Sequence, residues 1–239
     1  MMNILLPTDF SGNSRNAAAY ALQFFKDVPC TFYLLHVIPI STEKIGTAYV
    51  QTSSGIQENF NQLLDWMNSI KVNPQHNFNI IFKANYLIEA VREQVQEKNI
   101  DLILMGTKGV TNKKATVIGK NTSDVMMKVK CPVLAISENA VFQEHKEILF
   151  PTDYKISYSG KMLGILINLV SLSKSSLRIL EIFNSEKEPS EEQKENRTFL
   201  QHSFFPQEPI FHSYYSSGNT SASKIFMANN NIDMIALAA

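Results

Sequence analysis

The sequence has few cysteines and no long apolar run. Only Cys30 and Cys131 occur among the 239 residues, too few for the disulfide framework of a small secreted domain, so two free thiols in a reducing cytosol are expected. No stretch approaches the ~20 apolar residues that cross a bilayer, and residues 1–7 lack the basic segment of a secretory signal. These absences predict a cytoplasmic protein without a membrane partner.

The sequence also lacks an excess of charge of either sign. Lys plus Arg and Asp plus Glu number 22 each, which leaves no overall basic field to attract nucleic acid or anionic lipid. Apolar residues make up 44% and charged residues 18%, a mixture typical of folded globular proteins. The chain is longer than the usual domain of about 100–150 residues, which favours two compact units.

Two segments of the first half recur, in the same order, in the second half. The segment ILLPTDF at 4–10 returns as ILFPTDY at 148–154, and NIDLILMG at 99–106 returns as NIDMIALA at 231–238. Two matches in register indicate the duplication of a whole domain. We expect one domain at residues 1–138 and a second, degenerate and C-terminally incomplete copy at residues 147–239.

Short apolar runs alternate with longer segments of helical periodicity, which predicts an α/β fold in which a doubly wound parallel sheet lies between helical layers. Runs that are apolar on both faces suit the central strands of such a sheet. In the first copy we expect strands at 3–6, 31–37, 77–83, 102–106 and 133–136, and helices at 14–28, 57–70 and 87–98.

In such folds, ligands bind at the carboxyl ends of the strands. This rule selects three places: Pro7, Thr8 and Asp9 after the first strand, the His36–Val37 pair at the end of the second, and the segment that begins at Gly106 after the fourth.

A glycine-rich loop follows the fourth strand. It contains Gly106, Gly109 and Gly119, and it carries four lysines, Lys108, Lys113, Lys114 and Lys120, before the first acid at Asp124. Glycine allows the backbone to approach a ligand closely, and the N–H groups at the start of the following helix form an anion site. Asn121, Thr122 and Ser123 are expected N-cap residues that could also face phosphate. The alternative is that the glycines only punctuate a surface loop.

The loop has the spacing G-x2-G-x9-G. Together with Pro7–Ser11, the His36–Val37 pair and the Cys131–Leu134 strand, it resembles the ATP-binding branch of the universal stress proteins over residues 1–137. The resemblance implies adenine near Asp9 and the Val37 backbone, ribose near Gly106 and Gly109, phosphates on Gly119 through Thr122, and Met105 beneath the nucleoside. The predicted nucleotide-binding residues are Pro7, Thr8, Asp9, Val37, Met105, Gly106, Lys108, Gly109, Gly119, Lys120, Asn121 and Thr122.

The sequence departs from the family pattern after the third glycine, where Lys120 replaces the usual Ser or Thr. Lysine either supplies a charge-assisted phosphate contact or points to solvent and weakens binding. In the second copy, Glu181 and Ile182 replace His36 and Val37, so no nucleotide is expected there. His36 lies among apolar strand residues and is interpreted as structural. No catalytic residue and no metal site is predicted.

Three functions remain open on the sequence. The first is a non-enzymatic stress-response protein that responds to ATP or ADP, with Mg²⁺ as a possible companion of the nucleotide. The second is a slow ATPase, and the third is a nucleotide-free scaffold with a vestigial loop. The resemblance also implies a two-fold contact, like that of the family's homodimer, with the closing strand Pro132–Ile136 as the contact element of the first copy. Because the second copy lacks the counterpart of this strand, we expect the surface to be exposed and to join two chains into a dimer.

Overall fold

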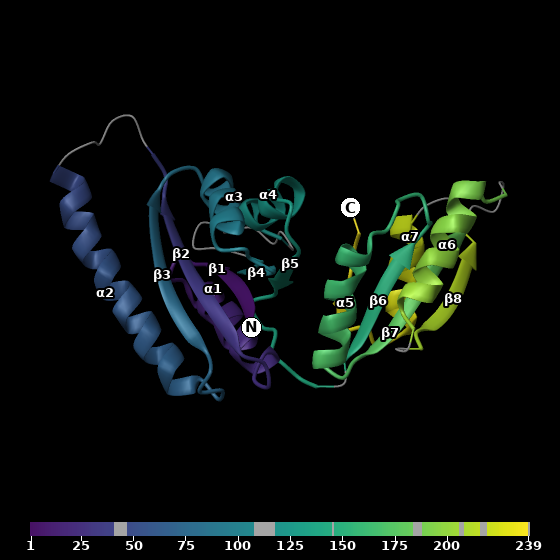
Figure 1. Cartoon of the computed structure of the whole chain (residues 1–239), viewed down its shortest axis with the longest axis horizontal. Helices are drawn as coiled ribbons and strands as arrows, with labels where there is room; N and C mark the ends of the chain where they lie inside the picture. Colours follow the sequence, from purple (N-terminus) through teal and green to yellow (C-terminus); the bar gives the residue numbers. More distant parts are fainter. Residues whose placement is uncertain are drawn as a thin grey trace. The chain divides into compact units, whose positions relative to one another are not determined.

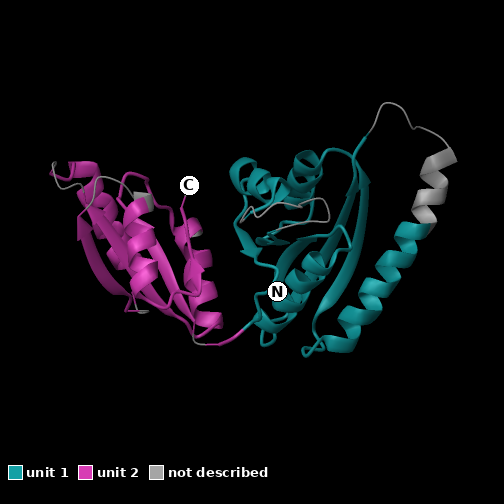
Figure 2. Ribbon diagram, turned by 180° about the vertical axis from the view of Figure 1, so that it is seen from behind, with its two compact units in different colours: residues 1–142 teal, residues 143–239 magenta. Residues whose placement is uncertain are grey.

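The computed structural model describes residues 1–40, 47–107, 118–144, 146–183, 188–205, 208–215 and 219–238. The chain divides into two compact units, Met1–Phe142 (unit 1) and Gln143–Ala239 (unit 2), which Figure 2 shows in different colours. Each unit has its own parallel sheet and its own apolar core. None of the described helices is both long and apolar enough to cross a bilayer.

Unit 1 alternates strands and helices (Figure 1). Its five-stranded parallel sheet has the order β3-β2-β1-β4-β5, and its elements are β1 (Met2–Pro7), α1 (Gly12–Phe24), β2 (Cys30–Ile38), α2 (Thr47–Ile70), β3 (Asn77–Ala84), α3 (Leu87–Glu97), β4 (Leu102–Gly106), α4 (Lys120–Lys128) and β5 (Val133–Ile136).

The central strands β1, β2 and β4 of unit 1 contain runs of consecutive buried residues because helices cover the sheet from both sides, whereas the edge strand β3 is only partly buried. Leu5, Ile103 and Met105 face the layer of α3 and α4, where they pack with Val125 and Val129. The opposite face lies under α1 and α2, and α1 turns its buried alanines toward the sheet. Burial of such apolar side chains contributes roughly 1.5–3 kcal/mol for each large residue.

Unit 2 repeats this order with a four-stranded sheet, β8-β7-β6-β9, in its described residues. Its elements are β6 (Glu147–Thr152), α5 (Gly160–Leu172), β7 (Ser176–Phe183), α6 (Glu191–Ser203), β8 (Ile210–Tyr215), α7 (Asn219–Asn229) and β9 (Met234–Ile235).

The repeat extends to individual hydrogen bonds. In unit 1 the Asn3 amide donates to Asp101 Oδ2 at 2.8 Å, and in unit 2 the Glu147 amide donates to Asp233 Oδ2 at 3.0 Å. In both units the residue after the Pro-Thr-Asp segment has a positive φ, 61° at Phe10 and 62° at Tyr154. The predicted fold class, two tandem doubly wound α/β domains, is therefore confirmed.

The predicted strands of unit 1 agree with the structure to within two residues. The predicted helices agree less well. α1 begins two residues before Ser14 and ends at Phe24 rather than Val28, and α2 begins already at Thr47 rather than Gln57. The smaller differences lie at helix ends, where boundaries shift easily by a residue or two; the larger one at α2 follows a run of weak helix formers.

Candidate functional site

The candidate site of unit 1 lies where the direction of strand order reverses. The chain passes from β1 to β2 on one side and to β4 on the other. In open α/β sheets, the crevice where ligands bind lies outside the carboxyl ends of the strands at such a switch point, here β1 and β4. The two strands pair in parallel, with Leu5 opposite Ile103. This register brings the end of β1 at Pro7, and Thr8 and Asp9 after it, close to Met105 and Gly106 at the end of β4.

Gly106 is packed between two helices at this crevice. A Cβ atom at Gly106 would lie 3.0 Å from the Asn13 carbonyl oxygen, at the start of α1. On its other side, the Gly106 carbonyl accepts a hydrogen bond of 2.7 Å from Thr122 Oγ1, in the first turn of α4. A side chain at this position would have to push the start of α1 away, so glycine allows α1, α4 and the end of β4 to approach closely.

The N-terminus of α4 has unpaired backbone donors and no acid. Gly119 is the N-cap residue and provides no side-chain cap, and helix geometry leaves the amide groups of residues 120–122 without intrahelical acceptors. The first turn has no acid. The first acid along α4, Asp124, is paired with Lys128 at 2.7 Å, and this hydrogen bond lowers the pKa of Asp124. Backbone donors and the helix dipole therefore favour a negative ligand at this end.

The predicted capping role of Asn121, Thr122 and Ser123 was wrong, because Gly119 is the N-cap and these residues lie in the first turn. The Ser123 amide instead donates to the Gly119 carbonyl at 3.0 Å. Thr122 is buried, and its hydroxyl holds the helix to β4 rather than pointing into solvent. Lys120 is exposed at the first position of the helix.

The β1–α1 turn shapes the other rim of the crevice. Asp9 Oδ1 accepts hydrogen bonds from the Ser11 amide at 3.1 Å and from Ser11 Oγ at 2.6 Å. Ser11 is the N-cap of α1, and its hydroxyl also accepts from the Ser14 amide at 3.2 Å. Asp9 therefore supports the cap of α1 while the residue remains exposed at the rim.

His36 has a structural position, as the sequence predicts. Its Nδ1 lies 2.8 Å from the Thr8 carbonyl oxygen and must donate, because a carbonyl only accepts. Its ring packs against Phe10, Phe60 and Phe82 at centroid distances of 4.6, 6.3 and 6.3 Å. The next residue along β2, Val37, is half-buried and pairs with Lys83 of β3.

Met105 is buried in the core beneath the crevice. Lys108, Gly109, Lys113 and Lys114, which the sequence also assigns to the loop, lie outside the described residues. Two contributors were missed in the sequence: Asn13, which abuts Gly106, and Thr107, whose carbonyl accepts from the Gly119 amide. Thr107 lies within the glycine motif and could have been found there, whereas nothing in the sequence marks Asn13.

Unit 2 fills the position of His36 with a buried carboxylate. Glu181 is 2% exposed and accepts hydrogen bonds from Tyr154 Oη at 2.7 Å, Arg197 Nε at 2.7 Å and Ser213 Oγ at 2.9 Å. Tyr154 and Ser213 occupy the places of Phe10 and Phe82, so an aromatic cluster in unit 1 corresponds to an ionic cluster in unit 2.

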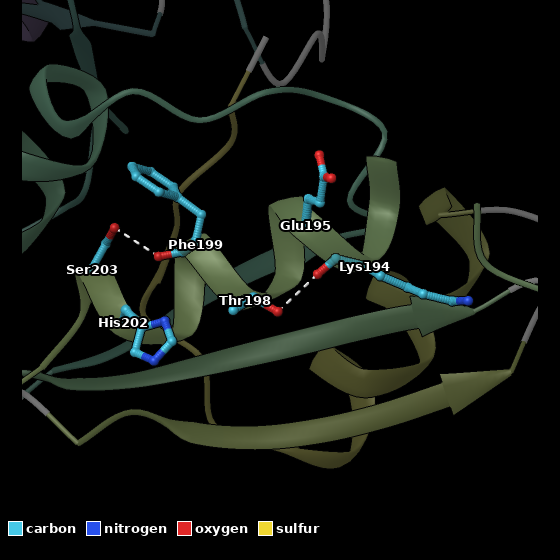
Figure 3. Close-up of a pocket in the computed structure, with 6 residues that line it drawn as sticks. All are labelled: Lys194, Glu195, Thr198, Phe199, His202 and Ser203. Atoms are coloured by element: carbon cyan, nitrogen blue, oxygen red, sulfur yellow. Dashed lines mark hydrogen bonds between the residues drawn. The ribbon is translucent and has the colours of Figure 1, made fainter. Parts of the chain in front are cut away.

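Two surface hollows lie in unit 2. One is an open hollow on α6, shown in Figure 3; its lining comes from that single helix, and its Thr198 and Ser203 hydroxyls donate to the helix's own carbonyls. The other, about 320 Å³, lies at the carboxyl ends of β6 and β9 between Asp153 and Leu237. Among the residues that the structure describes, no cluster of His, Cys, Asp or Glu has the composition of a metal site.

Residues 1–137 match the Universal stress protein family. Universal stress protein MJ0577 of Methanocaldococcus jannaschii is 28% identical over 152 residues, which cover 56% of this chain and 93% of that protein. A universal stress protein from Archaeoglobus fulgidus DSM 4304 is similar in structure over 99% of this chain and 85% of its own, with a TM-score of 0.71 and 18% identity. A functionally unknown protein, PA1789, from Pseudomonas aeruginosa PAO1 matches 99% of this chain and 81% of its own, with a TM-score of 0.61 and 16% identity. The two structural matches therefore extend over both units.

Proposed function

Because the chain belongs to the universal stress protein family, we propose that unit 1 binds ATP or ADP and that the protein acts as a nucleotide-responsive stress-response protein. The observation that carries the proposal is the N-terminus of α4, which points three backbone donors away from the helix beside Gly106, at the switch point of the sheet. Anions are stabilised at such helix ends by roughly 0.3–1 kcal/mol in exposed positions, and by more where the site is partly buried.

In this proposal the phosphates lie at Gly119 through Thr122, on the free amides of residues 120–122, which we call the phosphate cradle; the Gly119 amide itself donates to Thr107. The Lys120 ammonium adds a charge-assisted contact. The ribose lies near Gly106 and Gly109, and the adenine between Asp9 and the Val37 backbone, above the buried Met105. Any accompanying Mg²⁺ would be coordinated mainly by phosphate and water oxygens, as is usual for this ion.

Hydrolysis of the bound nucleotide is expected to be slow. A hydrolase needs a base within hydrogen-bond reach of the attacking water, and the described residues around the cradle do not supply an evident one. The His36 ring is held by its Nδ1 bond to the Thr8 carbonyl and packs among three phenylalanine rings. Asp9 Oδ1 accepts hydrogen bonds from Ser11. We therefore propose binding rather than turnover as the main activity.

Calorimetric titration of the whole chain with ATP tests the proposal, with one site per chain as the expected result. The most informative variant is Asn121→Asp. An acid in the first turn is stabilised by the helix dipole, but its charge repels phosphate. The melting temperature should be unchanged or raised, while ATP affinity should fall at least tenfold. The matched control is Asn139→Asp, at an exposed position. Two sites per chain, or equal affinity of Asn121→Asp and the control, would contradict the proposal.

We further propose that two chains associate through β5. Among the described residues β5 pairs only with β4, and its Val133 side chain is half-buried whereas Leu134 is buried. Sedimentation at micromolar concentration should give a dimer, and Val133→Lys should give a monomer without loss of fold. A wild-type monomer would refute this association.

The free thiols of Cys30 and Cys131 support a cytoplasmic location.

A further inference from the structure

Residues 137–142, which we call the strap, follow β5 and end unit 1. Asn16 of α1 holds the start of the strap, because its Nδ2 donates to the carbonyls of Ser137 and Ala140, each at 3.1 Å. The Ala140 amide donates to the Ser137 carbonyl at 3.0 Å and closes a turn. The strap is thus fixed to α1 by side-chain bonds to its backbone.

An aromatic contact holds the other end of the strap. The Phe142 ring packs edge-on against Tyr20 and Phe24 of α1, at centroid distances of 5.6 and 5.4 Å. Its neighbour Val141 is 71% exposed. Aromatic pairs of this geometry are worth about 0.5–1.5 kcal/mol beyond the area that they bury. The chain leaves unit 1 only after this second anchor.

A short series of contacts joins the strap to the N-terminus of α4. The Gly119 amide donates to the Thr107 carbonyl, and the Thr107 amide donates to the Ile136 carbonyl at 2.9 Å. The next residue, Ser137, begins the strap. Only Thr107 and Ile136, the last residue of β5, therefore lie between Gly119, the N-cap of α4, and the start of the strap.

A second path returns through α1. Gly106, whose carbonyl holds Thr122 of α4, abuts the Asn13 carbonyl. Asn13 lies one helical turn before Asn16, which holds the strap. Because residues three apart lie on the same face of a helix, the side of α1 that meets Gly106 is also the side that holds the strap. The two paths make a closed ring of contacts.

We propose that the strap and the phosphate cradle are energetically coupled. A polyphosphate bound at α4 then makes local opening of the strap less frequent, and an intact strap raises the affinity for the polyphosphate. The inference rests on the proposed function, since it requires an anion at α4. A phosphate bound to the amides of residues 120–122 fixes the first turn of α4 and with it Gly119, whose own amide donates to the Thr107 carbonyl. The Thr107 peptide and the end of β5 are ordered in turn. Coupling of this kind is reciprocal. Nucleotide occupancy thereby changes how often the strap, which leads to unit 2, detaches from α1.

Hydrogen exchange and calorimetry on the full chain test the coupling. ATP should slow the exchange of strap amides, that of Ala140 above all, about fivefold or more, within the usual range of coupled sites. Asn16→Ala and Phe142→Ala should each lower ATP affinity and remove this protection. Their matched controls, Asn139→Ala and Val141→Ala, change exposed positions of the same strap and should behave as wild type.

The outcomes separate this inference from the function on which it rests. If the wild-type chain binds ATP but strap exchange is unchanged, and Asn16→Ala binds as tightly as Asn139→Ala, the coupling is refuted and the nucleotide site stands. If the wild-type chain binds no ATP, both are refuted. Loss of ATP affinity in Asn16→Ala without loss of melting temperature, together with loss of strap protection, supports the coupling.

Discussion

Replacing Glu181 by glutamine should destabilise unit 2 and leave unit 1 intact. Burial alone would raise the pKa of this carboxyl, but hydrogen bonds from Arg197, Tyr154 and Ser213, with the Arg197 charge, outweigh burial and hold the pKa below its usual range. The carboxylate is therefore ionised at neutral pH and is the acceptor on which three side chains depend.

The expected loss follows from these contacts. Hydrogen bonds to a charged group contribute about 1.5–3 kcal/mol each, and breaking a fully buried ion pair costs about 3–5 kcal/mol. Glutamine keeps one carbonyl acceptor and the shape of the side chain, and Arg197 is 44% exposed, so water replaces part of its interaction. We therefore expect a loss of roughly 2 kcal/mol in the unfolding free energy of unit 2.

Urea unfolding with two probes measures this loss. Trp66, the single tryptophan, lies in α2 and reports on unit 1, whereas far-UV circular dichroism reports on both units. Glu181→Gln should lower the midpoint of the dichroism transition that belongs to unit 2 without moving the Trp66 transition. The control Glu192→Gln changes an exposed residue of α6 and should lie within about 0.5 kcal/mol of wild type. A Glu181→Gln value within the same range would refute the reasoning.

Three further predictions concern acid, packing and phosphate. Because the folded pKa of Glu181 lies below its unfolded value of about 4.3, unit 2 should lose stability as the pH falls below about 4.3; dichroism melts at pH 3 and 5 check this, and an unchanged difference between them in Glu181→Gln would contradict it. Gly106→Ala should destabilise unit 1 by about 1–3 kcal/mol in urea, because the new Cβ meets the Asn13 carbonyl at 3.0 Å. Gly55→Ala, in open space on α2, should stabilise it by about 0.5–1 kcal/mol, and the same sign for both would count against the packing. Lys120→Ala should weaken ATP binding more than AMP binding, by about 1–3 kcal/mol, and Lys120→Ser should recover part of the loss; equal weakening in calorimetry would place Lys120 away from the phosphates.

The fold was predictable because local patterns and the repeat agree. The β4 and β5 strands were predicted at the residues that form them, since their apolar runs are bounded by loop residues on both sides. The start of α2 was missed because Ser53, Ser54 and Gly55 are weak helix formers, and the helix continues through them. The low helix propensity of these three residues does not end the helix.

The site was predictable only in its backbone elements. The spacing of glycines and lysines predicts a phosphate loop, and the structure places Gly106 at the end of β4 and Gly119 and Lys120 at the start of α4; their contact with a nucleotide stays a prediction. The Asn16–Ser137 bond joins residues 121 positions apart, and a single sequence holds no signal for such a pair. Likewise, a lone acid in the apolar strand around Glu181 implies some buried partner, but nothing identifies that partner as Arg197.

The different chemistry at His36 and Glu181 also affects how two similar units fold on one chain. Neighbouring copies of a fold risk exchanging equivalent strands during synthesis. If β7 entered the place of β2, Glu181 would lie among the Phe10, Phe60 and Phe82 rings, and burial of an unpaired carboxylate costs several kcal/mol. In the reverse exchange, Arg197 would lose its acceptor. The two clusters therefore disfavour an exchange of β2 and β7 between the sheets.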